Sequence, residues 1–463
     1  MARFAMAVWL LLVLMLGGSS RGDNAALMAL VPVSVFVVIW LAVVRGARGV
    51  DGIAWPIGVV LVLVTIGLVQ LIPLPPVIWA SLGGREPLVA VDRLIGTADV
   101  WRPISLSPIR TWSAVFSLSV PLAAILLYAR MRRSDQQLVV PLLIGAAVIS
   151  AVFAIAQAVT PGAEFLYFYR YTNLGEPVGL FANRNHNAVF LSTSLIWMGY
   201  AASHADSRYM PPRNVRLALA SAAGVVIVAI LINASRAGLV SAALALVFAA
   251  LIAVCRSMER PAGGQARARV PMRVQLAGRQ WAIPGSALAA AVITGGVAVL
   301  SLVLLLSARL PAIDRVARTG MGDELRLGMI PALLDMAWRH LPFGTGLGVF
   351  DLAYRRYEAD ALLMENYINN AHDDWLQLVI EGGVPLAVLA IIASGWVLVR
   401  GWQLIRLGGK ARGLALCIWG SWLIFGLASL VDYPLRTPIM MAVTALLGCI
   451  LATAPTRGGG QTQ

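Results

Sequence analysis

The chain has 463 residues, of which 59% are hydrophobic and only 13% are charged. A soluble domain carries about 25% charged residues, so this composition excludes a protein that is solvated on all sides. The formal net charge is +14. An excess of this size is also typical of nucleic-acid binding, so the distribution of the charge along the chain has to decide what it means.

Long apolar runs recur along the chain, separated by short arginine-rich turns. A helix needs roughly 20 apolar residues to cross a bilayer, and it satisfies its own backbone hydrogen bonds there. We therefore predict an all-α, polytopic membrane protein, a single multi-pass domain over residues 1–463 with about 12 transmembrane helices. The predicted spans cover residues 4–18, 25–44, 56–73, 113–129, 137–158, 186–203, 215–233, 238–255, 283–307, 379–399, 413–431 and 439–453.

Basic residues are concentrated in alternate loops between these spans. One side of the predicted topology carries 20 basic and 4 acidic residues, and the other carries 16 basic and 18 acidic residues. The positive-inside rule places the basic side, with both termini, in the cytoplasm. The excess charge therefore indicates topology and not a nucleic-acid partner. The Arg-, Gly- and Pro-rich segment 256–282 is predicted to be a basic cytoplasmic linker facing anionic membrane lipids.

The first apolar run is short and ends in Gly17-Gly18-Ser19-Ser20, as a signal peptide also does. We expect a retained helix because the second span follows at once; cleavage would leave eleven spans and the same later topology. The cysteines Cys255, Cys417 and Cys449 all fall in spans, so no disulfide is expected in an outer loop.

Three outer segments are longer than a turn: residues 74–112, 159–185 and 308–378. The largest, 308–378, is predicted to be a partly helical periplasmic loop between helices 9 and 10, since its middle part carries apolar residues at helical spacing. Gly344-Thr345-Gly346-Leu347-Gly348 follows Leu-Pro-Phe and not a strand, which argues against a nucleotide loop. We interpret it as a flexible turn before a helix over residues 348–358.

Two predicted spans begin, on the outer side, with an arginine beside a capping residue. Asn183 or Asn185 can cap the span that starts near Arg184, and Ser235 can cap the span that starts near Arg236. A helix N-terminus offers free N–H groups and a positive dipole potential, so these positions suit a ligand with more than one negative charge. The alternative is ordinary capping with arginines that bind phospholipid headgroups.

His372 stands in Asn369-Asn370-Ala371-His372-Asp373-Asp374, where the large outer loop runs into a new apolar span. A neutral imidazole facing the periplasm can act as a general base for a sugar hydroxyl. A histidine that is merely solvated in the loop is the alternative. No Cys/His spacing or helical carboxylate pair indicates a metal site, and we expect no metal and no cofactor.

Taken together and in this order, four motifs resemble the O-antigen ligase and polymerase superfamily. They are Gly-x-Phe-x-Asn-Arg-Asn-His (179–186), Ser-Arg-x-Gly (235–238), Pro-Phe-Gly-x-Gly-x-Gly-x-Phe (342–350), and Ala-His-x-Asp-Trp-Leu-Gln-Leu with Glu-Gly-Gly (371–383). The twelve predicted spans and the large loop before the tenth match this family too. Asp373 is a departure, because the family usually has Asn there.

The resemblance implies a metal-independent glycosyltransferase of the bacterial inner membrane with its active site facing the periplasm. The donor would be a glycan on undecaprenyl diphosphate, and the acceptor a saccharide or lipid A-core. Arg184 and Arg236 would bind the diphosphate, with Arg326 as a further phosphate contact. His372 would deprotonate the acceptor hydroxyl, and Asp374 would orient His372. Trp375 and Leu376 are expected to dock the loop helix.

The resemblance leaves the exact activity open. A ligase and a polymerase of undecaprenyl-diphosphate-linked repeat units use the same donor and differ in the acceptor. A transporter or flippase of lipid-linked glycans is the alternative from another class. It would need charged groups lining a cavity within the spans, and the predicted spans are nearly free of charge at mid-depth.

Overall fold

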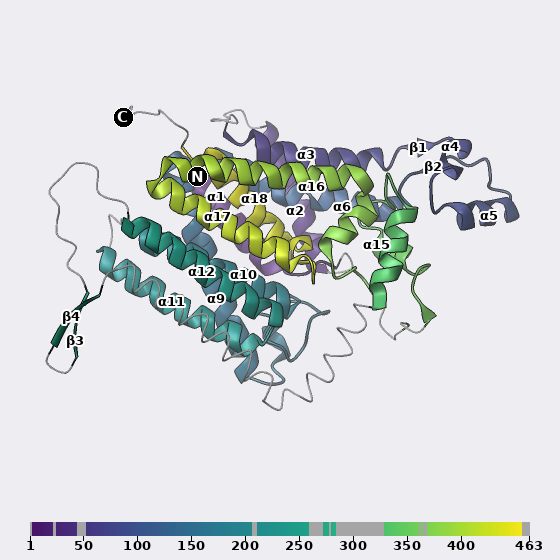
Figure 1. Ribbon diagram of the computed structural model, residues 1–463. Helices are drawn as coiled ribbons and strands as arrows, with labels where there is room; N and C mark the ends of the chain where they lie inside the picture. Colours follow the sequence, from purple (N-terminus) through teal and green to yellow (C-terminus); the bar gives the residue numbers. More distant parts are fainter. Residues whose placement is uncertain are drawn as a thin grey trace. The chain divides into compact units, whose positions relative to one another are not determined.

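The computed structural model describes residues 2–21, 25–43, 52–205, 211–258, 272–276, 279–283, 328–360, 363 and 368–455. This part of the chain is mainly helical (Figure 1). The longer helices are α1 (Ala2–Leu16), α2 (Ala25–Val43), α3 (Ala54–Val69), α6 (Pro108–Ser117), α7 (Ser119–Arg130), α9 (Val139–Val159), α10 (Arg184–Ser203), α11 (Pro212–Asn233), α12 (Arg236–Met258), α16 (Asp374–Leu407), α17 (Gly409–Ala428) and α18 (Pro438–Thr453).

Short elements lie in the connections. They are α4 (Pro76–Ala80), α5 (Glu86–Leu94), α8 (Arg133–Gln136), α15 (Phe350–Tyr354), and the 3-10 turns η2 (Glu164–Leu166) and η4 (Pro434–Arg436). Strands β1 (Pro73–Leu74) and β2 (Arg102–Pro103) pair antiparallel, with Pro73 opposite Pro103. Strands β3 (Met272–Leu276) and β4 (Arg279–Ile283) pair in the same way, within the segment predicted to be a linker.

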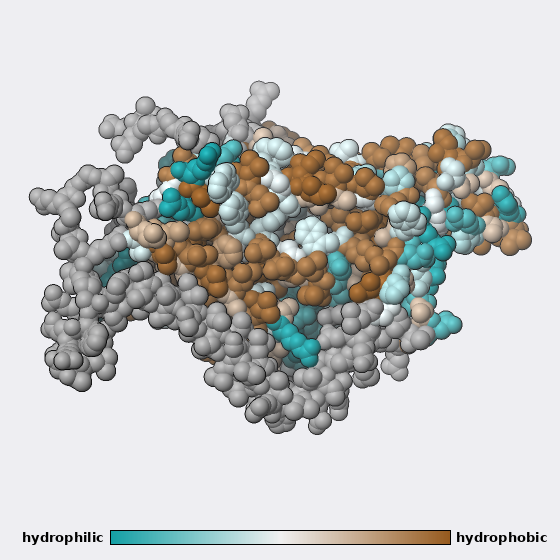
Figure 2. All heavy atoms as spheres, viewed as in Figure 1, coloured by the Kyte–Doolittle hydropathy of each residue, from teal (hydrophilic) through white to brown (hydrophobic). Residues whose placement is uncertain are grey.

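Seven of the described helical segments are long and apolar enough to cross a membrane. Three shorter apolar helices, α1, α3 and α18, coincide with further predicted spans. On the face shown in Figure 2, hydrophobic residues cover much of the helix flanks. The chain is thus a multi-pass, mainly helical membrane protein. The count of 12 spans stays a prediction, and residues 284–307 of the ninth lie outside the described part.

The chain divides into two compact units. The first comprises Met1–Arg132, Pro311–Trp396 and Leu427–Ala452. The second comprises Arg133–Leu310, Val397–Gly426 and Thr453–Gln463. The candidate histidine belongs to the first unit and the two candidate arginines belong to the second.

Within the second unit, α10 is a buried helix packed against α9, α11 and α12. All of its residues from His186 to Met198 are buried, including Ser192, Thr193 and Ser194. Their hydroxyl groups donate to backbone carbonyls, for example Ser192 to Gly238. A helix surrounded by other helices does not need an apolar surface facing lipid, which explains why α10 is less hydrophobic than its neighbours.

Arginines of the side predicted to be cytoplasmic bind the carbonyl groups at helix C-termini. Such carbonyls lack partners within the helix and carry negative dipole potential, so a guanidinium satisfies them well. The arginines that produce the positive-inside excess therefore also stabilise the C-termini of helices. The pairs are Arg130 with Leu41, Arg216 with Ala202, Arg412 with Ile405, Arg133 with Thr453, and Arg400 with Ala454.

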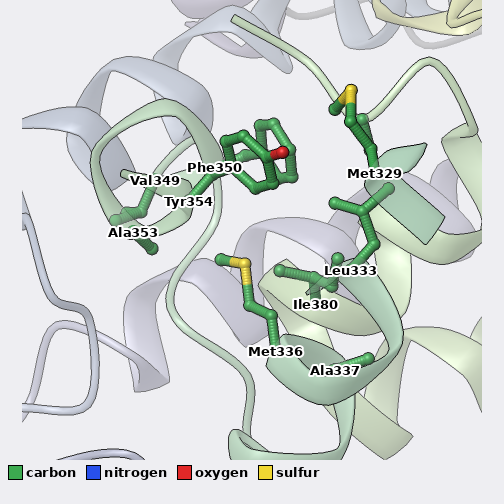
Figure 3. Packing of buried hydrophobic residues seen from close by; sticks show 10 residues of the cluster. Met329, Leu333, Met336, Ala337, Val349, Phe350, Ala353, Tyr354 and Ile380 are labelled. Atoms are coloured by element: carbon green, nitrogen blue, oxygen red, sulfur yellow. The ribbon is translucent and has the colours of Figure 1, made fainter. Parts of the chain in front are cut away.

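Within the first unit, the described part of the large loop packs on the start of α16. A helix over residues 328–339, as the apolar spacing predicts, contributes Met329, Leu333 and Met336 to a buried cluster. Phe350 and Tyr354 of α15 stack at 5.4 Å in the same cluster, and Ile380 of α16 completes it (Figure 3). Leu376 packs against this cluster, which confirms that it docks the loop helix.

The glycine-rich turn after cis-Pro342 is held against α16, where Gly383 kinks the helix. The N–H groups of Thr345 and Gly346 donate to the carbonyls of Ile380 and Glu381, and Val384 N–H donates to the Pro342 carbonyl. The turn is therefore packed between elements, in contrast to the flexible turn that the sequence predicts. The reason is that its glycines allow backbone to approach backbone.

A buried histidine joins the segment 73–107 to the end of the helix over residues 328–339. Arg85 donates to His340 Nδ1 at 3.2 Å, and His340 Nε2 lies 3.0 Å from the Tyr357 hydroxyl. Arginine is always a donor, so Nδ1 must be an acceptor and the imidazole must be neutral. Two effects lower the pKa of His340 from 6.5 to about 4. The larger is burial, and the next is the positive charge of Arg85.

Because of this contact, we expect the segment 73–107 to become less stable at acidic pH. Because the pKa of His340 is lower in the folded state, its contribution to stability is complete above pH 6.5 and is lost as pH falls toward about 4. Hydrogen exchange at Trp79–Ile104 should therefore rise across this window in the purified protein. In His340→Gln that dependence should be absent; an identical pH dependence in the variant would contradict the assignment.

Candidate functional site

Three of the motifs singled out in the sequence stand at helix N-termini. Helix α10 begins at Arg184, α12 begins at Arg236, and α16 begins at Asp374. The predicted spans begin at residues 186, 238 and 379, so the structure confirms the first two helix starts to within two residues and places the third five residues earlier. An N-terminus presents unpaired N–H groups and positive potential, so each of these positions favours a negatively charged group.

At the start of α10, the Asn183 side chain accepts the N–H of Asn185 at 2.8 Å and caps the helix. Arg184 is half-buried, and its Nη1 lies 3.0 Å from the Glu176 carboxylate. Glu176 is more exposed than Arg184, so this pair is a weak surface contact. A ligand with a higher negative charge can compete with it for Arg184.

The start of α12 lies beside the start of α10. Ser235 caps α12 by accepting the Gly238 N–H at 3.1 Å, and its hydroxyl donates to Asn185 Oδ1 at 2.9 Å. Asn233 donates to the carbonyl of Arg184 at 3.0 Å. The two arginine-bearing N-termini are thereby hydrogen-bonded to each other within one unit, and Arg236 is exposed next to them.

The turn that joins α11 to α12 has an unusual backbone. Ala234 has φ of 53° and ends α11 in the left-handed conformation. Among the described residues, the other non-glycine residue with positive φ is His372, also at 53°. Such residues cost roughly 1–3 kcal/mol and cluster at functional sites. Each of these positions lies two residues before the start of a helix that the sequence singles out.

His372 lies between the start of α16 and the turn that follows α17. Its Nδ1 atom lies 3.5 Å from Asp432 Oδ1, and its ring packs edge-on against Tyr433 at 5.0 Å. The His372 side chain is 26% exposed, whereas that of Asp432 is 4% exposed. The 3.5 Å separation is longer than an ordinary hydrogen bond, as catalytic contacts often are before substrate binds.

The backbone on both sides of His372 is anchored. Ala371 N–H donates to Gln377 Oε1 at 2.8 Å, and Asp374 N–H donates to the Ser429 carbonyl at 2.8 Å. Asp373 Oδ1 accepts the Leu376 N–H at 2.9 Å, so it acts as a helix cap. Asn caps as well as Asp, which explains physically why either residue can occupy position 373.

Asp374 is buried and is engaged by another residue, Arg436. Arg436 Nε lies 3.0 Å from Asp374 Oδ1, and Arg436 Nη1 lies 3.0 Å from Glu381 Oε2. The sequence predicts that Asp374 orients His372; in the structure, the carboxylate that faces His372 at 3.5 Å is that of Asp432. The role of Asp374 toward His372 stays a prediction, and Arg326 lies outside the described residues.

Sequence reasoning missed Asp432 and Arg436. A signal was present, since these are the two charged residues of a short connection between two predicted spans. That connection is on the side predicted to be outer, the same side as His372. Charged residues in such a position are functional candidates. The proximity of Asp432 to His372, and of Arg436 to Asp374, comes only from the tertiary structure.

The comparison with known families agrees with these motifs. Residues 221–391 match the family model described as O-Antigen ligase. This part of the chain is similar to O-antigen ligases. No curated protein matches the chain.

The match confirms the resemblance to the O-antigen ligase and polymerase superfamily. Similarity to this family supports the conclusion that the protein is an enzyme of membrane glycan assembly and that its substrates are lipid-linked glycans. The matched range contains Arg236, the glycine-rich turn at 342–350 and His372. Arg184 and Asp432 lie outside the range, yet each contacts an element that lies within it.

Proposed function

We propose that this protein is a glycosyltransferase that moves a glycan from an undecaprenyl-diphosphate carrier onto a saccharide acceptor at the periplasmic face of the inner membrane. The observation that carries the proposal is His372, held in a strained backbone conformation with Asp432 facing its Nδ1. A proton on Nδ1 is favoured by the Asp432 carboxylate, and this leaves Nε2 as a proton acceptor.

In the proposed reaction, His372 Nε2 takes the proton of an acceptor hydroxyl. The hydroxyl oxygen then forms a bond to the anomeric carbon of the donor sugar. The bond from that carbon to the diphosphate oxygen breaks, and undecaprenyl diphosphate leaves with the electron pair. The imidazolium that forms is stabilised by Asp432, in the way that a buried carboxylate supports a catalytic histidine.

Arg184 and Arg236 are proposed to bind the diphosphate. Negative charge grows on the leaving oxygens during the reaction, and donors aimed at developing charge lower the barrier. The two adjacent N-termini add dipole potential at the same place. Two guanidinium groups suit a diphosphate better than a single phosphate, because each can contact a different phosphoryl group.

Removal of one guanidinium should weaken donor use. We expect Arg236→Ala to reduce transfer by about tenfold to a hundredfold, since a hydrogen bond to a charged group contributes roughly 1.5–3 kcal/mol. Arg236→Lys, which keeps the charge, should retain more activity. Arg170→Ala is the matched control, because Arg170 is exposed and its guanidinium lies over the Tyr171 ring, 5.5 Å from the ring centroid. Equal losses in the Arg236 and Arg170 variants would contradict the assignment.

Mass spectrometry of lipid-linked glycans in a deletion strain tests the function itself. Accumulated long chains that lack an acceptor would support ligation, and accumulated single repeat units would support polymerisation. Reconstituted protein that moves a lipid-linked glycan across a bilayer without changing its covalent structure would refute the proposal in favour of transport.

A further inference from the structure

We propose that Arg436 is a positioning residue that holds Asp432 and His372 in register by bridging Asp374 and Glu381. The proposal rests on the proposed function, because it assigns a role in the same transfer reaction. Arg436 itself contacts neither substrate nor His372 in this scheme.

The bridge consists of two short ion pairs. Arg436 Nε lies 3.0 Å from Asp374 Oδ1, and Nη1 lies 3.0 Å from Glu381 Oε2. The side chains of Asp374 and Glu381 are 11% and 4% exposed, and that of Arg436 is 23% exposed. Water therefore screens these contacts little, and their geometry is more strictly defined than that of a surface pair.

The bridge holds the turn that carries Asp432. Asp374 Oδ2 also accepts the Ser429 hydroxyl at 3.2 Å and the Leu435 N–H at 3.4 Å. Asp374 and Arg436 thus attach the turn to α16 before and after Asp432. Loss of the guanidinium would weaken the attachment that follows Asp432, since of these contacts it would leave the 3.4 Å hydrogen bond from Leu435 N–H.

The same bridge reaches the backbone of the histidine. Glu381 Oε1 accepts from Gln377 Nε2 at 2.9 Å, and Gln377 Oε1 accepts the Ala371 N–H, directly before His372. One connected network therefore supports both partners of the His372–Asp432 contact. A residue at the centre of such a network can change the geometry of the contact without touching it.

The charges around Arg436 distinguish its proposed positioning role from phosphate binding. One guanidinium faces two buried carboxylates, so the positive charge of Arg436 is fully compensated within the protein. Burial by itself would lower the pKa of Arg436, and the charges of Glu381 and Asp374 outweigh burial and raise it. Arg436 is therefore charged and already paired with two buried carboxylates, whereas Arg184 pairs with the half-exposed Glu176.

The test is a double-mutant cycle with Arg436→Gln and Asp432→Asn. Purified protein is assayed with lipid extract of the deletion strain as donor and with acceptor-bearing membranes of that strain. We expect Arg436→Gln to lower kcat about a hundredfold, the effect of misplacing a catalytic group by roughly 1 Å, with the KM for the donor unchanged. If Arg436 acts through Asp432, the double variant loses no more than Asp432→Asn alone.

Arg110→Gln is the matched control, since it breaks a 3.1 Å ion pair with Asp351 in the same unit and should leave kcat near wild type. Arg436→Lys keeps the positive charge but cannot donate to both carboxylates as the planar guanidinium does, so it should give an intermediate kcat. It replaces Arg436→Gln in the cycle if that variant does not accumulate. Additive losses, or a raised donor KM with unchanged kcat, would overturn the role of Arg436. Full transfer by His372→Ala would instead overturn the proposed function.

Discussion

His372→Ala is expected to abolish glycan transfer while the protein still inserts into the membrane at normal levels. A general base contributes about 10²–10⁴ to the rate, and alanine has no group that can replace it. The lost side chain is 26% exposed and lies at a helix start, so its removal leaves no large cavity in the core. The measurement is the yield of transferred glycan on gels, normalised to protein in the membrane fraction.

Asp373→Asn is the control for this variant. Asp373 is the direct neighbour of His372, but its carboxylate caps α16 through the Leu376 N–H. Asparagine caps a helix equally well, so this variant should retain transfer. Wild-type glycan yield in His372→Ala would rule out its role as general base, whatever the result for Asp373.

Gly383→Ala should destabilise the first unit by about 3 kcal/mol or more. Gly383 has φ of 60° and ψ of −151°, a conformation that only glycine adopts readily. A Cβ atom there would overlap the Pro342 carbonyl oxygen, which belongs to the packed turn. The atoms that clash are backbone atoms, so a change of side-chain rotamer cannot relieve the clash. The turn at 342–350 must therefore separate from α16. Thermal unfolding of the purified protein and proteolysis within residues 342–350 measure this.

Gly395→Ala in the same helix provides the comparison. A Cβ atom at Gly395 would meet no atom within 4 Å. In a regular helix alanine is favoured over glycine by roughly 0.5–1 kcal/mol, so this variant should be as stable as wild type or slightly more stable. Equal melting temperatures for the two variants would show that the kink at Gly383 does not hold the turn.

Much of the helical architecture was predictable from hydropathy. Each described helix from α9 to α12 coincides with a predicted span to within a few residues at either end, because long apolar stretches can cross the bilayer only as helices. The short helices α4 and α5 were not predicted. Their residues expose apolar side chains such as Val77 and Leu94 and bury Asp92, so hydrophobicity alone does not indicate which side chains are buried.

The candidate site was predictable where its signals are local. Arg184 and Arg236 follow capping residues, and His372 precedes a predicted span, so one stretch of sequence is enough to place each at a helix N-terminus. Asp432 and Arg436 are recognisable as the charged residues of a short connection on the predicted outer side, but nothing in that connection indicates which residues they approach. They approach His372 and Asp374 because the turn after α17 is folded back onto the start of α16, through Ser429 and Leu435.

The sequence by itself determined that this is a multi-pass helical membrane protein with motifs of the O-antigen ligase and polymerase superfamily. Hydrophobicity and helix capping depend on residues that are close together in the sequence, so the sequence alone is enough to recognise them. Only the tertiary structure decided which carboxylate faces His372, and that the glycine-rich turn is clamped on the kink at Gly383. Those contacts join residues far apart in the chain, and a linear pattern does not encode which of several carboxylates will be nearest.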